Sequence, residues 1–183
     1  RPDLEALLLL GGLERRNAES IFGAIADKLR QVGVELLPAT TFMHDQLAGP
    51  GPLAGPRPGR RELADIRFGM QLAKEVSRLD IGQTVVVRSG TVLAVEGLDG
   101  TNATIRRGGE LGRGRAVVAK VSKPGQDLRF DVPVVGRRTL EVAAEARVRM
   151  LCVEAGGTLI LQRDDVMRLA AKHRVGLYGA EHE

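Results

Sequence analysis

Apolar residues recur along the chain with two periods, one typical of helices and the other of strands. In residues 18–32 the apolar positions lie three or four residues apart, and Asn17 precedes them as a plausible N-cap, so we predict an amphipathic helix. After a turn at Gly33, residues 34–38 read as a short strand. A helix followed by a tight turn and a strand is typical of the closing half of an α/β unit.

The rest of the chain alternates short apolar runs with helical segments. We predict a hairpin that turns at Ser89-Gly90, a short helix that begins at Thr101, and a buried strand before the next turn. The glycines around Gly108 and Gly112 read as a mobile turn. The predicted helices are 62–80, 101–107, 140–147 and 164–172, and the predicted strands are 85–87, 92–95, 115–123, 150–155, 158–162 and 175–179. This order predicts an α/β fold.

A stretch rich in proline and glycine separates the first helix from the later elements. Residues 48–61 read AGPGPLAGPRPGRR, a composition that suits neither a helix nor a central strand. We therefore predict two domains: residues 1–49, a linker at 50–60, and a mixed α/β C-terminal domain at 61–183.

Composition narrows the possible functions. The chain has 183 residues, of which 43% are hydrophobic and 27% charged, and no apolar run is long enough to cross a membrane. The single cysteine, Cys152, excludes a disulfide framework and favours the cytoplasm. The net charge of +4 and the pI near 9.7 suit an anionic ligand. Aromatic residues are only 3%, which argues against stacking on nucleic acid, so a phosphorylated ligand is the better prediction.

Candidate chemistry concentrates in residues 120–136, KVSKPGQDLRFDVPVVG. After a predicted turn at Pro124-Gly125, apolar and charged residues alternate, which predicts a strand with Asp127, Arg129 and Asp131 on its polar face. One interpretation is a solvated strand face on which Arg129 bridges two carboxylates. The other is a polyphosphate site with carboxylates for Mg²⁺ and cations for phosphate oxygens. Because a straight strand would separate the two aspartates by about 13 Å, one ion could not bind both unless the strand bends.

A second candidate segment is residues 94–107, AVEGLDGTNATIRR. A helix that begins after Gly100 would offer free backbone N–H groups to an anion. Asp99 and Asn102 would add oxygen ligands, or would simply cap the helix, which is the more common role of such residues. Arg106 lies near the end of the predicted helix.

Taken together, these segments resemble a known family. Residues 94–107, 120–136 and 153–173 are similar, in order and spacing, to the metal-dependent UDP-2,3-diacylglucosamine pyrophosphatases of lipid A biosynthesis in Gram-negative bacteria. The resemblance is to the type without a binuclear metallophosphatase core, for which three scattered histidines, His44, His173 and His182, would be too few.

The resemblance implies Mg²⁺-dependent hydrolysis of the substrate's pyrophosphate, with named roles for residues of this chain. The implied catalytic residues are Asp127, Asp131, Lys123 and Arg129, and the implied metal ligands are Asp127, Asp131 and Asp99. Substrate binding would fall to Gln126, Thr101, Asn102, Arg106 and Lys120. Where the family usually reads Glu-Gly-Thr-Asp, this chain has Asn102 in place of the last carboxylate, which would weaken metal binding or be tolerated.

The resemblance also bears on the domains and partners. Members of the family begin with a Rossmann-like domain, of which residues 1–49 would be only the tail, so a site between two domains would be incomplete here. We expect a cytoplasmic protein, with contact to the inner-membrane surface as an open possibility, and no nucleic-acid partner. The alternative function is a non-catalytic binding module for nucleotide-sugars or anionic lipid headgroups, which would use the same cations without turnover.

Overall fold

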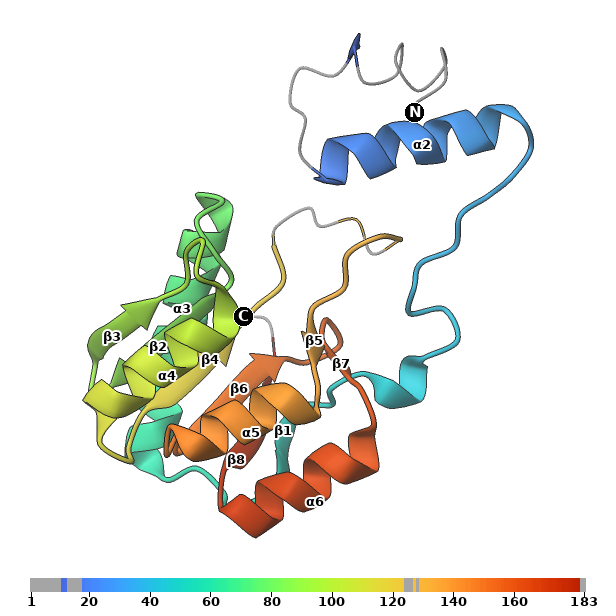
Figure 1. The fold of residues 1–183 in the computed structure, drawn as a ribbon. Helices are drawn as coiled ribbons and strands as arrows, with labels where there is room; N and C mark the ends of the chain where they lie inside the picture. The colour runs from blue at the N-terminus through green and yellow to red at the C-terminus, as the bar shows by residue number, and fades with distance from the viewer. Residues whose placement is uncertain (1–10, 13–17, 124–126, 128, 182–183) are drawn as a thin grey trace.

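The computed structural model describes residues 11–12, 18–123, 127 and 129–181, and its main feature is a six-stranded sheet (Figure 1). The sheet order is β1-β8-β6-β4-β2-β3, with β4, β6 and β8 parallel and with β1 and β2 antiparallel to their neighbours. The strands are β1 (Gly51–Ala54), β2 (Thr84–Arg88), β3 (Thr91–Val95), β4 (Val117–Lys120), β6 (Met150–Glu154) and β8 (Gly176–Ala180). A separate parallel pair consists of β5 (Val134–Val135) and β7 (Leu159–Ile160).

Helices cover both faces of the sheet, so the predicted α/β class is confirmed. In Figure 1, α4 (Gly100–Gly112), α5 (Arg137–Glu145) and α6 (Arg163–His173) cover one face, and α3 (Arg60–Arg78) covers the other. A hydrophobic core lies on each face of the sheet, because successive side chains of a strand point to opposite faces. Val86 and Val118 pack towards α4 and α5, whereas Val87 and Val117 pack towards α3. The remaining helices are α2 (Ala18–Gln31) and a short 3₁₀ turn, η1 (His44–Gln46).

The predicted linker is partly wrong, because residues 51–54 form strand β1 at the edge of the sheet. Proline excludes a central strand but is compatible with an edge strand, which needs hydrogen bonds on one side only, and Pro52 pairs with Tyr178 in this way. Glycines allow the close packing: a Cβ on Gly179 would collide with the carbonyl oxygen of Gly49. The boundary between two domains, as distinct from the linker, stays a prediction.

Two further sequence predictions are corrected. Residues 34–38 lie in an extended connection that pairs with no strand among the described residues. The glycines at 108, 109 and 112 lie inside α4, which continues to Gly112, and their missing side chains let the helix pack closely on its neighbours. Gly108 lies against Val86 of β2, so its role is packing rather than mobility. In the part of the chain that is described, no helix is both long and apolar enough to cross a membrane.

Candidate active site

The two candidate segments meet at one edge of the sheet, the edge at which β4, β6 and β8 end. Lys120 is the last residue of β4, and the segment 121–133 leaves the sheet there. Strand β3 is antiparallel to β2, which is antiparallel to β4, so β3 also ends at this edge and α4 begins there. In α/β sheets this carboxyl edge is the usual place for a ligand.

A polar cluster at this edge joins the two segments. The Thr101 hydroxyl donates to Glu96 Oε1 at 2.8 Å and accepts from Lys120 Nζ at 3.4 Å. The second carboxylate oxygen of Glu96 accepts the backbone N–H of Gln83 at 3.2 Å. Thr84, at the start of β2, also approaches Thr101 at 3.5 Å between the two hydroxyl oxygens. The cluster therefore holds the first turn of α4 against the end of β4.

Lys120 supplies the positive charge of this cluster. Burial lowers the pKa of its ammonium group, and the nearby charges of Glu96 and Asp131 offset this only in part. Asp131 lies eleven residues further along the chain, so its electrostatic influence places its carboxylate near the end of β4. An ammonium group desolvated in this way interacts strongly with an incoming anion.

The segment with Asp127, Arg129 and Asp131 is a turn, so the predicted strand is wrong. The backbone N–H groups of Phe130 and Asp131 both donate to the carbonyl oxygen of Asp127, at 3.0 and 3.1 Å. The Asp127 carboxylate also accepts the backbone N–H of Arg129 at 3.0 Å, which closes a local turn. Alternation of polar and apolar residues failed here because the aspartate side chain supplies the hydrogen bonds that a partner strand would have supplied.

Asp127 and Arg129 form a bidentate ion pair within this turn. The guanidinium donates from Nε to Oδ1 at 2.9 Å and from Nη2 to Oδ2 at 2.6 Å. Arg129 thereby holds the pKa of Asp127 below its ordinary value. The predicted bridge from Arg129 to both aspartates is thus formed to one of them.

Helix α2 contacts the same turn. The ring of Phe130 stacks on the ring of Phe22, with the two ring centroids 5.5 Å apart. The guanidinium of Arg129 lies over the Phe130 ring, 5.1 Å from its centroid. The negative charge of Asp27 also acts on Arg129. Helix α2 therefore packs on the candidate site, although Phe22 remains half exposed.

Comparisons with known proteins show the family of this chain. The model of the family described as the LpxI C-terminal domain matches residues 49–178 of this chain. This chain belongs to that family. It is also similar to UDP-2,3-diacylglucosamine pyrophosphatase LpxI of Caulobacter vibrioides, with 36% identity over 188 residues. The match covers 97% of this chain but 66% of that relative, so the chain spans just under two thirds of the relative's length.

A solved structure, Acinetobacter baumannii RibD, form 2, is also matched, with a TM-score of 0.37 and 16% identity. The match covers 64% of this chain and 36% of the other, and at this level it carries no argument. The predicted family is nonetheless confirmed by the LpxI C-terminal domain match, which begins at the edge strand β1 rather than after the predicted linker.

The remaining predicted residues of this LpxI-family chain do not all converge. Asp99 accepts hydrogen bonds from the guanidinium of Arg107 at 2.5 Å and from the backbone N–H of Gly97 at 3.2 Å, so it pairs with a residue of α4. Arg107 holds the pKa of Asp99 below its ordinary value. Asn102 is half-buried in the first turn of α4, Arg106 is exposed, and Gln126 lies outside the described residues.

Lys123 lies beside Asp80, with 2.6 Å between Nζ and Oδ1, in the loop after α3. Among the described residues, no group of three or more histidine, cysteine, aspartate or glutamate side chains is arranged to hold a metal ion. The predicted ligand set of Asp127, Asp131 and Asp99 is therefore not gathered at one point in the described structure.

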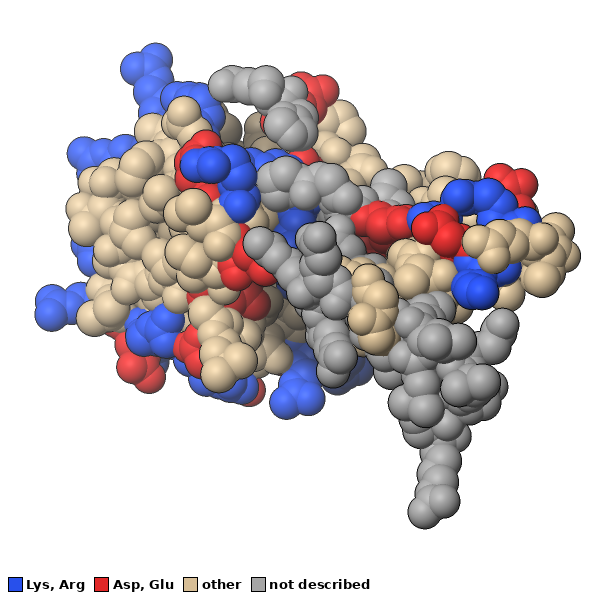
Figure 2. Space-filling model, turned by 90° about the horizontal axis from the view of Figure 1, so that it is seen from above, with Lys and Arg blue, Asp and Glu red and all other residues tan. Residues whose placement is uncertain are grey.

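Two carboxylates at this edge, Glu96 and Glu154, were not among the predicted site residues. Glu96 directly follows β3, and Glu154 is the last residue of β6, next to the point where the chain leaves β4. A carboxylate at the carboxyl end of a buried parallel strand is a detectable signal, and it was present in the predicted strand 150–155. Seen from above, acidic and basic side chains are interspersed over this end of the molecule rather than forming a uniform basic face (Figure 2).

Proposed function

We propose that this chain is the C-terminal part of a hydrolase that cleaves the pyrophosphate of UDP-2,3-diacylglucosamine. The products would be UMP and 2,3-diacylglucosamine 1-phosphate, in the synthesis of lipid A. The named relative, 36% identical over nearly the whole chain, supports the substrate. The observation that carries the proposal is the meeting of Lys120, Thr101 and Asp131, from separate segments, at the carboxyl edge of the sheet.

The chain's own residues suit a reaction in which negative charge develops on phosphate oxygens. A water oxygen forms a bond to one phosphorus while the bridging oxygen leaves with the electron pair and takes up a proton. Lys120 would bind a phosphate oxygen where desolvation makes its charge effective. Lys123 and Arg129 would exchange their aspartate partners for the substrate, since the pyrophosphate carries more charge than one carboxylate.

The donor chemistry of Asp127 and Asp131 fits Mg²⁺, which would neutralise the phosphate oxygens and lower the pKa of a bound water. Mg²⁺ usually takes one or two protein carboxylates and completes its coordination with substrate phosphates and water, so a protein cage of three ligands is not required. Asp99 is left out of this set because, among the described residues, its hydrogen bonds go to Arg107 and Gly97 and none joins it to the turn that carries Asp127 and Asp131. The magnesium requirement is thus assigned to the turn at 127–131.

Replacement of single carboxylates tests the proposal. Asp127→Ala and Asp131→Ala should each remove most of the Mg²⁺-dependent release of UMP from UDP-2,3-diacylglucosamine, measured by chromatography. Glu110→Ala, an exposed carboxylate at the far end of α4, is the control and should retain full activity. Full activity in both aspartate variants would refute the assignment. Tight substrate binding without UMP release in the unmodified protein, with or without metal, would favour a non-catalytic binding module instead.

The proposed site is completed by the N-terminal domain of the family. The packing of Phe22 of α2 on Phe130 supports this, because it brings residues before the LpxI C-terminal domain into the site. The 183-residue chain should therefore turn over slowly, and a version extended at its N-terminus to the length of its relative should be faster. Equal rates would place the chemistry wholly after β1. A cytoplasmic location and contact with the inner-membrane surface remain predictions.

A further inference from the structure

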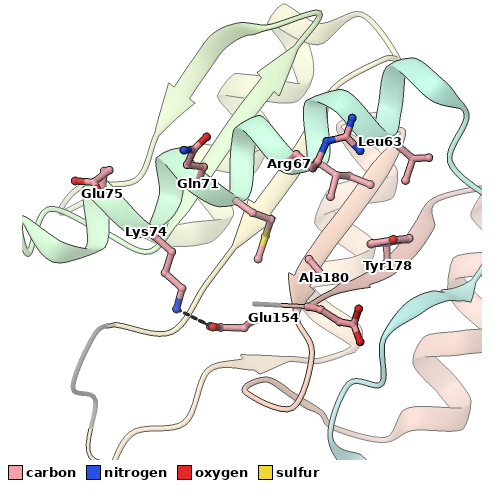
Figure 3. Close-up of a pocket in the computed structure, with 11 residues that line it drawn as sticks. Leu63, Arg67, Gln71, Lys74, Glu75, Glu154, Tyr178 and Ala180 are labelled. Atoms are coloured by element: carbon pink, nitrogen blue, oxygen red, sulfur yellow. Dashed lines mark hydrogen bonds and ion pairs between the residues drawn. The ribbon is translucent and has the colours of Figure 1, made fainter. Parts of the chain in front are cut away.

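A buried carboxylate, Glu154, lies at the base of the candidate segment without a role in the proposed chemistry. It is only 6% exposed, although it is charged and stands at the open edge of the sheet. Figure 3 shows its side chain facing Lys74 of α3, at one end of a cleft of about 650 Å³ between α3 and β8. A charged group in such a place is retained only if its partners compensate for the loss of water.

Those partners are Lys74 and Ser122. Lys74 Nζ lies 2.7 Å from Glu154 Oε1 and 2.9 Å from Oε2. The backbone N–H of Ser122 donates to Glu154 Oε2 at 2.9 Å, and the Ser122 hydroxyl donates to the same oxygen. Lys74 also donates to the carbonyl oxygen and the hydroxyl oxygen of Ser122, at 3.2 and 3.3 Å. Every polar group of Ser122 is therefore held by one of these two side chains.

This network is ionic at neutral pH. Burial by itself raises the pKa of Glu154, but the hydrogen bonds from Lys74 and Ser122 outweigh it and leave the pKa below its ordinary value. The carboxylate therefore stays negative and keeps accepting both hydrogen bonds from Ser122. The ammonium group of Lys74 provides the compensating charge.

Ser122 is where the chain leaves the sheet. Strand β4 ends at Lys120, and Val121 still bonds to the carbonyl of Gln83. Lys123, whose ammonium group is proposed to bind phosphate, follows Ser122 directly. The contacts of Ser122 therefore fix the backbone next to Lys123, in the segment that carries Asp127 further along the chain.

We infer that Glu154 and Lys74 are positioning residues for the proposed hydrolysis, which act by fixing Ser122. The inference rests on the proposed function and adds residues that do not contact the substrate. Misplacement of reacting groups by about 1 Å can cost roughly a hundredfold in rate, so loss of this anchor should lower kcat by about 10- to 100-fold. Because Glu154 does not itself bind substrate, KM should change little.

A matched pair of variants separates positioning from stability. Glu154→Gln keeps the shape of the side chain and removes its charge. The control, Asp65→Asn, makes the same change at a carboxylate that is also 6% exposed and also accepts two backbone N–H groups, those of Ser89 and Gly90 at 2.8 Å. Asp65 lies on α3 at the opposite edge of the sheet. Both variants should lower the Tm of the full-length protein, and only Glu154→Gln should lower kcat.

A second comparison tests whether Glu154 acts through Ser122. If it does, the kcat of the double variant Glu154→Gln/Ser122→Ala should be close to that of the worse single variant, because both changes break the same contact. Independent, multiplicative losses would overturn the inference, as would equal losses of kcat in Glu154→Gln and Asp65→Asn. If Glu154→Gln fails to fold, Ser122→Ala takes its place, with lowered kcat expected and unchanged kcat as the overturning result.

Hydrogen exchange tests whether Glu154 fixes Ser122, and it does so without a measurement of activity. In the substrate-free protein, Glu154→Gln should speed exchange of the backbone amides of Ser122 and Lys123, and Asp65→Asn should not. Equal exchange at these amides in both variants would overturn the inference. A wild-type protein that never releases UMP would instead refute the proposed hydrolysis, while the exchange comparison would still show whether Glu154 fixes this segment.

Discussion

Replacement of Gly108 by alanine tests whether close packing of α4 on the sheet positions the candidate site. An ideal Cβ at Gly108 would lie 2.5 Å from the Cβ of Val86, in the interior of the sheet. Val86 cannot move aside without a large cost in free energy, because it is fully buried in β2 between two strands. The helix must therefore shift outward by some tenths of an ångström or more.

The two contributions to stability have opposite signs. Overpacking of a core costs about 1–3 kcal/mol, and replacing a helical glycine by alanine returns about 0.5–1 kcal/mol. A contact of 2.5 Å is severe, so the overpacking cost should lie in the upper part of that range, at about 2–3 kcal/mol. The net loss should therefore be about 1–2.5 kcal/mol, which lowers Tm by about 2–10 °C in a chain of this size. The outward shift should also move Thr101 away from Lys120 and lower the rate of UMP release.

The measurement is thermal unfolding followed by circular dichroism, with Gly23→Ala as the control. Gly23 lies within α2 and an added Cβ there would meet no atom within 4 Å, so the same substitution should leave Tm unchanged or raise it slightly. A Gly108→Ala protein as stable as wild type would refute the packing role assigned to Gly108. A destabilised protein with unchanged activity would show instead that the position of α4 does not control the site.

Three further predictions concern accessibility and pH. Burial raises the pKa of the Cys152 thiol to about 12, so a thiol reagent at pH 8 should label it only after denaturation; rapid labelling of the native protein would contradict its burial. The depressed folded-state pKa of Glu154 adds stability that is fully present above its ordinary value of 4.5 and is lost as pH falls through the lower folded value. The difference in urea midpoint between wild type and Glu154→Gln should accordingly be constant near neutral pH and should shrink below about pH 4.5. A difference that stays constant down to pH 3 would refute the ionic network. Limited proteolysis should cut first within residues 32–43, which connect α2 to the sheet, and not within β1; first cuts at 51–54 would contradict the pairing of β1 with β8.

Hydrophobic periodicity correctly predicted several helices and strands. The hairpin at Ser89-Gly90 and the buried strands at 115–123 and 150–155 are present, because each has one or two apolar faces that a core covers. The helix at 18–32 is also present, although its apolar face is only partly covered. The same rule failed at 127–132, where polar and apolar residues do alternate. The described residues of this segment pair with no strand, and hydrogen bonds to Asp127 form a turn. Periodicity predicts which face of a segment is apolar, but it does not predict which other segment packs or pairs with it.

The predictions of a linker at 50–60 and of a mobile turn around Gly108 were wrong or partly wrong for a related reason. A run of these residues indicates where regular structure is weakened, but the sequence does not show whether another element approaches closely. Gly108 and Gly179 both lie where a side chain would collide with a neighbouring strand or segment, and Pro52 lies on an edge. Only the tertiary structure distinguishes a glycine that loosens the chain from one that allows close packing.

The candidate site was predictable in part. Lys120, Thr101 and Asp131 were identified from the resemblance of two segments, and the structure brings them together because β3 and β4 end at the same edge of the sheet. The pairing of Asp99 with Arg107 could not be predicted, since it depends on where the helix begins relative to the preceding loop. Glu154 was missed because its partner Lys74 is 80 residues away in sequence and on another element.

The candidate segment is supported at both of its ends by different parts of the chain. At its base, Glu154 and Lys74 hold Ser122 from within the LpxI C-terminal domain, and near its far end Phe130 packs on Phe22, which precedes that domain. Between these points, Asp127 and Arg129 neutralise each other, so an anionic substrate must separate them before either can act on it. The fixed base sets where the charged groups are presented, whereas the contact with α2 is half exposed and free to change as the pair opens. If the proposed site is divided in this way, it needs residues from before and after β1, and the matched family domain alone should bind phosphate through Lys120 and yet hydrolyse slowly.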